Sequence, residues 1–127
     1  MASVNAIKRF LAMIIVLGTL VSTSTVSADQ WFDSYGKLSG NDELARFSNL
    51  AFFLQDHPET VGYIAFCTSK TESNADVFRQ KTRGVNFVVS RFHLRRSRFK
   101  IINYGPCAKT RTILQPIDKT KQVPSFF

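Results

Sequence analysis

The two cysteines, Cys67 and Cys107, are the residues of this sequence with the most restricted chemistry. Such a pair can form a disulfide or take part in a metal site. A zinc site needs further ligands at short spacing, whereas the two histidines, His57 and His93, lie on other segments without such spacing. We therefore expect no metal centre and no cofactor. The compartment decides between a disulfide and two free thiols.

Hydrolytic chemistry would need a general base that is held in place by an orienting partner. Serine, histidine and aspartate are all present, but no pair of them has a recognisable spacing. Neither a Gly-x-Ser-x-Gly nor a His-Glu-x-x-His pattern occurs. We expect a protein that is not an enzyme, and a small secreted hydrolase acting on anionic polymers is the less favoured alternative.

Positive charge is concentrated between residues 91 and 100. The formal net charge of the chain is +8, which favours anionic partners. Five cations could form one basic patch that attaches the protein to an anionic surface, or they could be ordinary solvated charges. These cations are Arg91, Arg95, Arg96, Arg98 and Lys100.

The first 28 residues have the pattern of a signal peptide. Lys8 and Arg9 precede an apolar run at residues 10–21, and a small, polar stretch then extends to Ala28. Small residues three and one before the cut, here Val26 and Ala28, predict cleavage after Ala28. An uncleaved anchor is the alternative, but it would need about 20 apolar residues.

From this pattern we expect an exported protein, which is periplasmic or secreted. Its partners would be peptidoglycan, another anionic envelope polymer or an envelope protein, and we expect neither nucleic acid binding nor an integral membrane span after cleavage. Loss of the two leader cations lowers the net charge from +8 to +6. Because this compartment is oxidising, one intramolecular disulfide between Cys67 and Cys107 is favoured over two free thiols.

The first predicted helix covers residues 42–57, where apolar side chains recur at helical spacing. Asn41 is its predicted N-cap, and Pro58 ends it because the residue before a proline is pushed out of the α region. Phe52 and Phe53 widen the apolar face, as expected for a helix that lies on a sheet.

The second predicted helix starts at Ser73, three residues before Asp76, which is close to a capping-box pattern. Helical spacing continues to Phe92, and the cations at residues 91, 95 and 96 suit the negative end of a helix. A glycine costs a helix about 1 kcal/mol relative to alanine, so Gly84 is predicted to mark close packing.

Four strands are predicted, at residues 31–39, 60–67, 98–105 and 111–117. The second and third are apolar runs typical of buried strands. A hairpin-like connection follows the third strand, and Pro116 suggests that the fourth is an edge strand or ends there.

The predicted fold is therefore α/β (α+β) in class, with the element order β-α-β-α-β-β. Strand–helix–strand alternation implies a mixed sheet with parallel pairs and two helices on one face, a two-layer sandwich. A single domain is expected at residues 29–118, followed by an irregular tail at residues 119–127.

This order behind a signal peptide resembles the OmpA-like (MotB-like) peptidoglycan-associated domain, over residues 32–117. Residues 42–66 are similar to that family's first helix, proline break and second strand. Residues 32–64 more closely resemble a group of short exported bacterial proteins that begin with Phe-Asp-x-Tyr-Gly and have no assigned activity. The resemblance implies an OmpA-like fold.

The resemblance also implies a ligand site after the second strand. The family has Thr-Asp there and Leu-Ser-x-x-Arg-Ala in the second helix, and its Asp and Arg hold the diaminopimelate of the peptide stem. In this sequence Thr68 and Ser69 stand where Thr-Asp would, and Arg83 stands where the arginine would, one residue closer. The Leu-Ser pair is replaced by arginine and glutamine.

The loss of the aspartate changes what this site can bind. Arg83 can still donate two hydrogen bonds to a carboxylate, or it is a solvated arginine on the helix surface. Ser69 cannot neutralise an ammonium, and Glu72 is a possible substitute. The expectation is a non-catalytic cell-envelope module with a degenerate peptidoglycan site.

Overall fold

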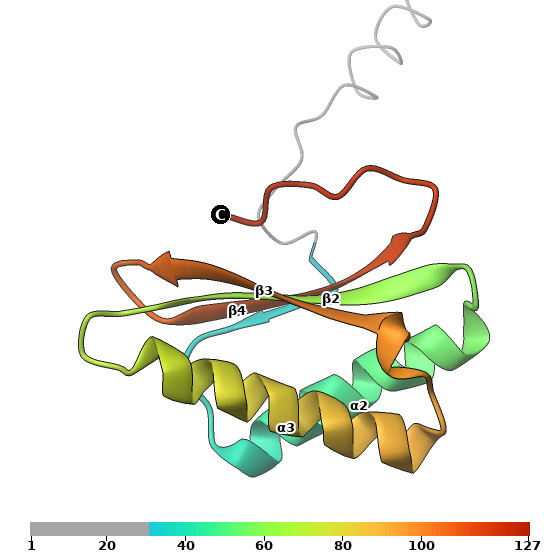
Figure 1. Ribbon diagram of the computed structural model, residues 1–127, viewed down its shortest axis with the longest axis horizontal. Helices are drawn as coiled ribbons and strands as arrows, with labels where there is room; N and C mark the ends of the chain where they lie inside the picture. The colour runs from blue at the N-terminus through green and yellow to red at the C-terminus, as the bar shows by residue number, and fades with distance from the viewer. Residues whose placement is uncertain (1–30) are drawn as a thin grey trace, which may run out of the picture. The chain divides into compact units, whose positions relative to one another are not determined.

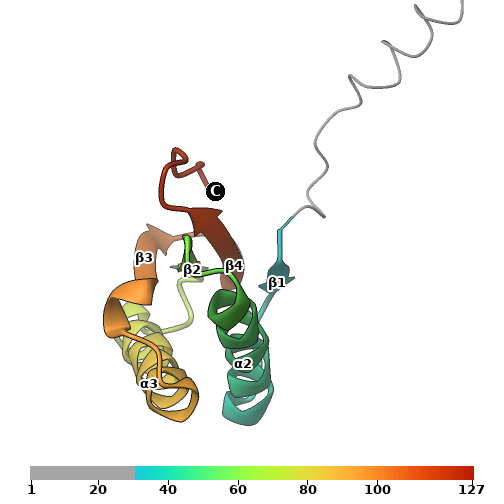
Figure 2. The same ribbon diagram turned by 90° about the vertical axis from the view of Figure 1, so that its right-hand side faces the viewer.

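The computed structural model describes residues 31–127, and the predicted signal peptide lies outside these residues. A four-stranded sheet forms one layer, and two long helices cover one of its faces (Figures 1 and 2). The predicted two-layer α+β arrangement is thus confirmed. In chain order the elements are β1 (Asp33–Tyr35), α2 (Gly40–Asp56), β2 (Thr60–Thr68), α3 (Asn74–Phe92), the 3-10 helix η2 (Arg96–Arg98), β3 (Phe99–Pro106) and β4 (Arg111–Asp118).

Helix α2 begins two residues earlier than the sequence pattern predicted. Its N-cap is Ser39, not Asn41, because the Ser39 hydroxyl accepts a hydrogen bond from the backbone N–H of Asp42. A serine oxygen at this position satisfies one of the backbone donors that the first helical turn leaves free. The helix ends at His57, before Pro58, as predicted.

Helix α3 begins as predicted, because the Ser73 hydroxyl accepts from the N–H of Asp76. Its end lies at His93, which has a left-handed backbone with φ 54°. The next residue, Leu94, donates its N–H to the carbonyl of Val89 and closes the last turn. Arg91 is therefore in the last turn, whereas the predicted cations at residues 95 and 96 follow the helix.

The strand order is β1-β4-β2-β3. β2 and β3 are parallel, and β4 is antiparallel to both β1 and β2. The connection from β3 to β4 is therefore not a hairpin, since it passes the end of β2 (Figure 1).

Two positions in the sheet differ from those expected. β4 is an interior strand, and Pro116 is tolerated because β1 pairs with β4 only as far as Leu114. β3 is an edge strand, and its side chains Lys100, Asn103 and Tyr104 are exposed. An apolar run can occur in an edge strand as well as in an interior strand, so sequence patterns do not separate edge strands from interior strands.

The main core lies between the sheet and the helices. Phe47, Leu50 and Leu54 of α2 and Val85 of α3 are fully buried against Ile64 of β2.

Close contact between the two helices depends on a glycine. A Cβ atom on Gly84 would lie 2.7 Å from a ring carbon of Phe47, which is too close for any other residue. The prediction that this glycine marks close packing is confirmed.

The opposite face of the sheet is covered by the chain after β4 (Figure 1). This segment, residues 119–127, has no helix or strand, but Phe126 is buried with Ala65 and Ile113. Trp31 packs on the Phe126 ring at a centroid distance of 5.1 Å. The segment is thus part of the packed domain.

Candidate functional site

An open hollow of about 760 Å³ lies at one edge of the sheet, namely the edge that the ends of the strands form and not an edge strand. It is lined by residues 36–37, 69–72 and 106–110. These segments follow β1, follow β2 and connect β3 to β4, so three strands end at this edge. Ligands in open α/β sheets commonly bind beyond the carboxyl ends of the strands. We call this site the lysine hollow, after the lysines that line it.

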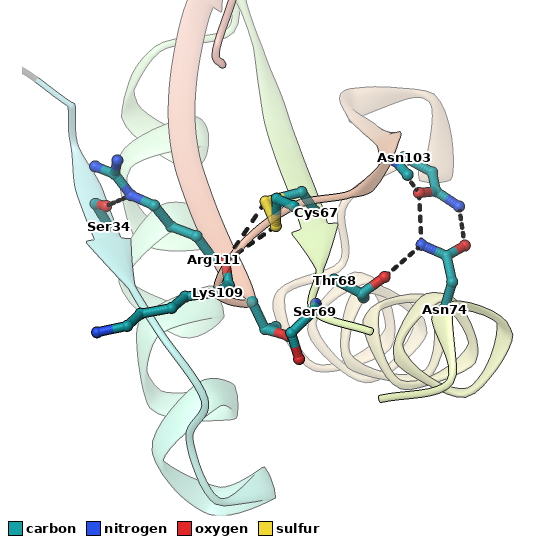
Figure 3. The surroundings of a disulfide bond; sticks show 11 residues. Ser34, Cys67, Thr68, Ser69, Asn74, Asn103, Lys109 and Arg111 are labelled. Atoms are coloured by element: carbon teal, nitrogen blue, oxygen red, sulfur yellow. Dashed lines mark hydrogen bonds between the residues drawn. A yellow bond between two sulfur atoms is a disulfide. The ribbon is translucent and has the colours of Figure 1, made fainter. Parts of the chain in front are cut away.

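A disulfide between Cys67 and Cys107 holds two walls of the lysine hollow together (Figure 3). The two Cα atoms are 5.8 Å apart, so the predicted pairing is confirmed. The N–H of Cys107 also donates to the carbonyl of Thr68 at 2.8 Å. Both sulfur atoms contact the carbonyl oxygen of Lys109, but a disulfide sulfur has no proton to donate.

Thr68, the first predicted ligand residue, is buried beneath the lysine hollow. Its side chain accepts a hydrogen bond of 2.9 Å from the amide of Asn74, at the start of α3 (Figure 3). Asn74 in turn exchanges two hydrogen bonds with Asn103 of β3. With only 3% of Thr68 exposed, its hydroxyl ties β2 to α3 and is not free for a ligand.

Ser69, the second predicted ligand residue, lines the lysine hollow, and so does Glu72. The N–H of Ser69 donates to the Thr110 hydroxyl, and its own hydroxyl lies 2.9 Å from that of Thr71. Three hydroxyl groups thus form a polar side of the hollow.

Three lysines give the hollow its charge and its name. The hollow is lined by Lys37, Lys70 and Lys109, and the one acidic residue in its lining is Glu72. All three lysines are exposed, and none forms a salt bridge within residues 31–127. The N-terminus of α3, which carries partial positive charge, begins directly after this loop. An anion is therefore the favoured occupant.

Arg83, the third predicted ligand residue, does not line the lysine hollow. It lies instead on a groove of about 390 Å³ between α2 and α3, together with Leu44, Gln80 and Phe87. α3 begins five residues after Ser69, so Arg83 stands about 14 Å along the helix axis from the helix start. The structure does not bring Ser69 and Arg83 to one pocket.

Four of the five cations of the predicted basic patch are exposed, whereas the fifth, Arg98, is hydrogen-bonded to the protein itself. Arg91, Arg95, Arg96 and Lys100 are exposed. Arg98 is partly buried, and its guanidinium donates to the carbonyls of Leu54, His57 and Thr60 at 2.8 to 3.0 Å. A cation suits the carboxyl end of α2, so the Arg98 side chain has a structural role.

The histidines lie at the other edge of the sheet from Ser69. His57 ends α2 and precedes β2, and His93 ends α3 and precedes β3. Both histidines therefore lie where the parallel strands β2 and β3 begin. The His57 ring stacks on Phe53 and bonds its carbonyl. Within residues 31–127, no cluster of His, Cys, Asp or Glu could hold a metal ion.

A buried charge cluster was missed by sequence reasoning. Glu43 and Lys81 are each 4% exposed, and the lysine Nζ donates to Glu43 Oε2 at 2.5 Å. The Tyr35 hydroxyl donates to the same oxygen at 2.6 Å. Burial, and then the charge of Glu43, raise the pKa of the Tyr35 phenol far above its usual value. The Thr112 hydroxyl opposes this shift to a smaller extent and has no regular hydrogen bond within the described chain.

Helical spacing contained a signal for this cluster. Glu43 stands four residues before Phe47 and seven before Leu50, on the buried face of α2. Lys81 stands four residues before Val85, on the buried face of α3. A charged residue on each of two facing apolar stripes predicts a buried pair, since an isolated buried charge is too costly.

Comparisons with known proteins do not identify a family. No family model matches the chain, and no curated protein matches it. None of the helices within residues 31–127 is long and apolar enough to cross a bilayer.

Proposed function

We propose that this protein is an exported, non-catalytic module of the cell envelope whose lysine hollow binds carboxylate groups of the peptidoglycan peptide stem. The observation that carries the proposal is the set of three exposed lysines around hydroxyl groups at the sheet edge where β1, β2 and β3 end. The OmpA-like resemblance points to the same edge, at Ser69.

Binding of a zwitterion such as diaminopimelate needs an anion beside a cation. In this proposal Lys70 and Lys109 both pair with carboxylate groups of the ligand, in place of Arg83. Glu72, on the same hollow, pairs with the ammonium in place of the missing aspartate. Partly exposed pairs of this kind each contribute up to about 1 kcal/mol, so the binding is weak and sensitive to salt.

Co-sedimentation of residues 29–127 with purified sacculi tests the proposal. The double variant Lys70→Gln/Lys109→Gln should bind about tenfold more weakly, because two charge contacts are lost. The matched control is Lys119→Gln/Lys121→Gln, since these exposed lysines follow β4 at the opposite edge of the sheet. Equal losses in both variants, or no sedimentation of the wild type at low salt, would refute the proposal.

A second candidate function is electrostatic attachment to anionic envelope polymers through the basic patch. Arg91, Arg95, Arg96 and Lys100 are exposed and favour it. Their replacement by glutamine should then remove sacculus binding, whereas Lys70→Gln/Lys109→Gln should not. Release of muropeptides during the same incubation would instead revive the hydrolase alternative.

A further inference from the structure

Three phenylalanines are exposed on the helices, namely Phe52, Phe87 and, nearer the start of α3, Phe78. Phe52 of α2 is 59% exposed and Phe87 of α3 is 45% exposed. Phe52 was expected to widen the face that lies on the sheet, but its ring packs edge-on against Phe92, with centroids 4.8 Å apart. Phe87 lines the groove between the helices, beside Leu44. Large apolar side chains of this kind are unfavourable in water unless something covers them.

Two cations flank Phe87 on the surface of α3. Arg83 and Arg91 stand four residues before and after Phe87, and both are exposed, so they are its neighbours on the surface of α3. The exposed acids of the two helices are Asp42, Asp56 and Asp76, of which Asp76 is paired with Arg79 and Asp56 stands four residues after Phe52. We define the phenylalanine face as Phe52, Arg83, Phe87 and Arg91.

We propose that the phenylalanine face binds the surface of an anionic lipid bilayer. Aromatic rings enter the boundary between headgroups and acyl chains, while arginines remain among the lipid phosphates. A sugar or peptide polymer offers charge but no apolar phase for Phe52 and Phe87, and this favours lipid over a wall polymer. Arg95 and Arg96, exposed just after α3, extend the positive charge next to this face. The inference does not depend on the lysine hollow.

Vesicle flotation with residues 29–127 tests this proposal. The protein should float with vesicles of phosphatidylglycerol and phosphatidylcholine, and much less with phosphatidylcholine alone. Phe52→Ser and Phe87→Ser should each lower the partition coefficient about tenfold, because each variant has one aromatic ring fewer to transfer from water into the bilayer. Arg83→Gln/Arg91→Gln should lower it severalfold in the anionic vesicles only.

Two controls separate this face from other surfaces. Phe127 is also 45% exposed but belongs to the segment on the opposite side of the sheet (Figure 1), so Phe127→Ser should leave flotation unchanged. Lys70→Gln/Lys109→Gln should also leave it unchanged, even if sacculus binding is lost.

Three outcomes would overturn the proposal. The first is a wild type that does not float with anionic vesicles. The second is flotation that depends on the arginines but not on Phe52 and Phe87, which indicates charge attraction alone. The third is a wild-type dimer in sedimentation that Phe87→Ser dissociates without any vesicle binding, which assigns the face to a second copy of the chain.

Discussion

Removal of the buried cation Lys81 should destabilise the protein strongly. Lys81→Met keeps the length of the side chain but leaves the carboxylate of Glu43 buried, with the Tyr35 hydroxyl as its remaining donor at 2.6 Å. Breaking a buried pair in this way typically costs about 3–5 kcal/mol. Because the free energy of unfolding of a small domain is about 5–15 kcal/mol, Lys81→Met should remove a large part of the stability.

An exposed ion pair on the same helix provides the control. Asp76 and Arg79 also form a salt bridge, but both side chains are 66% exposed. Arg79→Met should therefore change the free energy of unfolding by less than about 1 kcal/mol. The comparison isolates burial, since both substitutions remove one cation from α3.

Replacement of the whole cluster should recover the lost stability. Tyr35→Phe/Glu43→Leu/Lys81→Met removes all three polar side chains of the cluster together, so none of the three is left without its partner, and such apolar replacements are often neutral or stabilising. Urea unfolding followed by circular dichroism measures all three variants. If Lys81→Met were no less stable than Arg79→Met, the described burial of the Glu43–Lys81 pair would be wrong.

Three further predictions concern the disulfide, the lysine hollow and pH. Reduction should lower the melting temperature, because opening a 40-residue loop costs about 4 kcal/mol in the chain-entropy account; two alkylated thiols at Cys67 and Cys107 without reductant would contradict the disulfide. Ser69→Asp should raise the affinity for a diaminopimelate-containing muropeptide severalfold, because one added charge contact contributes up to about 1 kcal/mol. The gain should persist with Arg83→Ala, since Arg83 lines a different groove, and its disappearance would show that this arginine reaches the hollow. Above about pH 10 the unfolded chain releases a phenol proton that folded Tyr35 keeps, so stability falls by up to about 1.4 kcal/mol per pH unit; Tyr35→Phe should remove this part of the slope, and equal slopes would refute it.

Local sequence signals determined where most elements lie. Ser73 and Pro58 act through their own backbone neighbours, so the start of α3 and the end of α2 were readable without tertiary structure. The Cys67–Cys107 pairing was also readable, because the chain contains two cysteines and both lie at or just after the carboxyl ends of predicted strands. Ser39 was missed as a cap because Asn41, two residues later, is an equally good cap by type.

Tertiary structure alone decided the neighbours of each element and therefore the site. An apolar run is compatible with an edge or an interior position, so the exchange of roles between β3 and β4 depended on the pairing of β1 with β4, which leaves β3 at the edge. The same holds for Arg83, because the length of the loop before α3 sets how far along the helix it stands from Ser69. Lys37, Lys70 and Lys109 are far apart in sequence, and they line one hollow only because three strands end at one edge of the sheet.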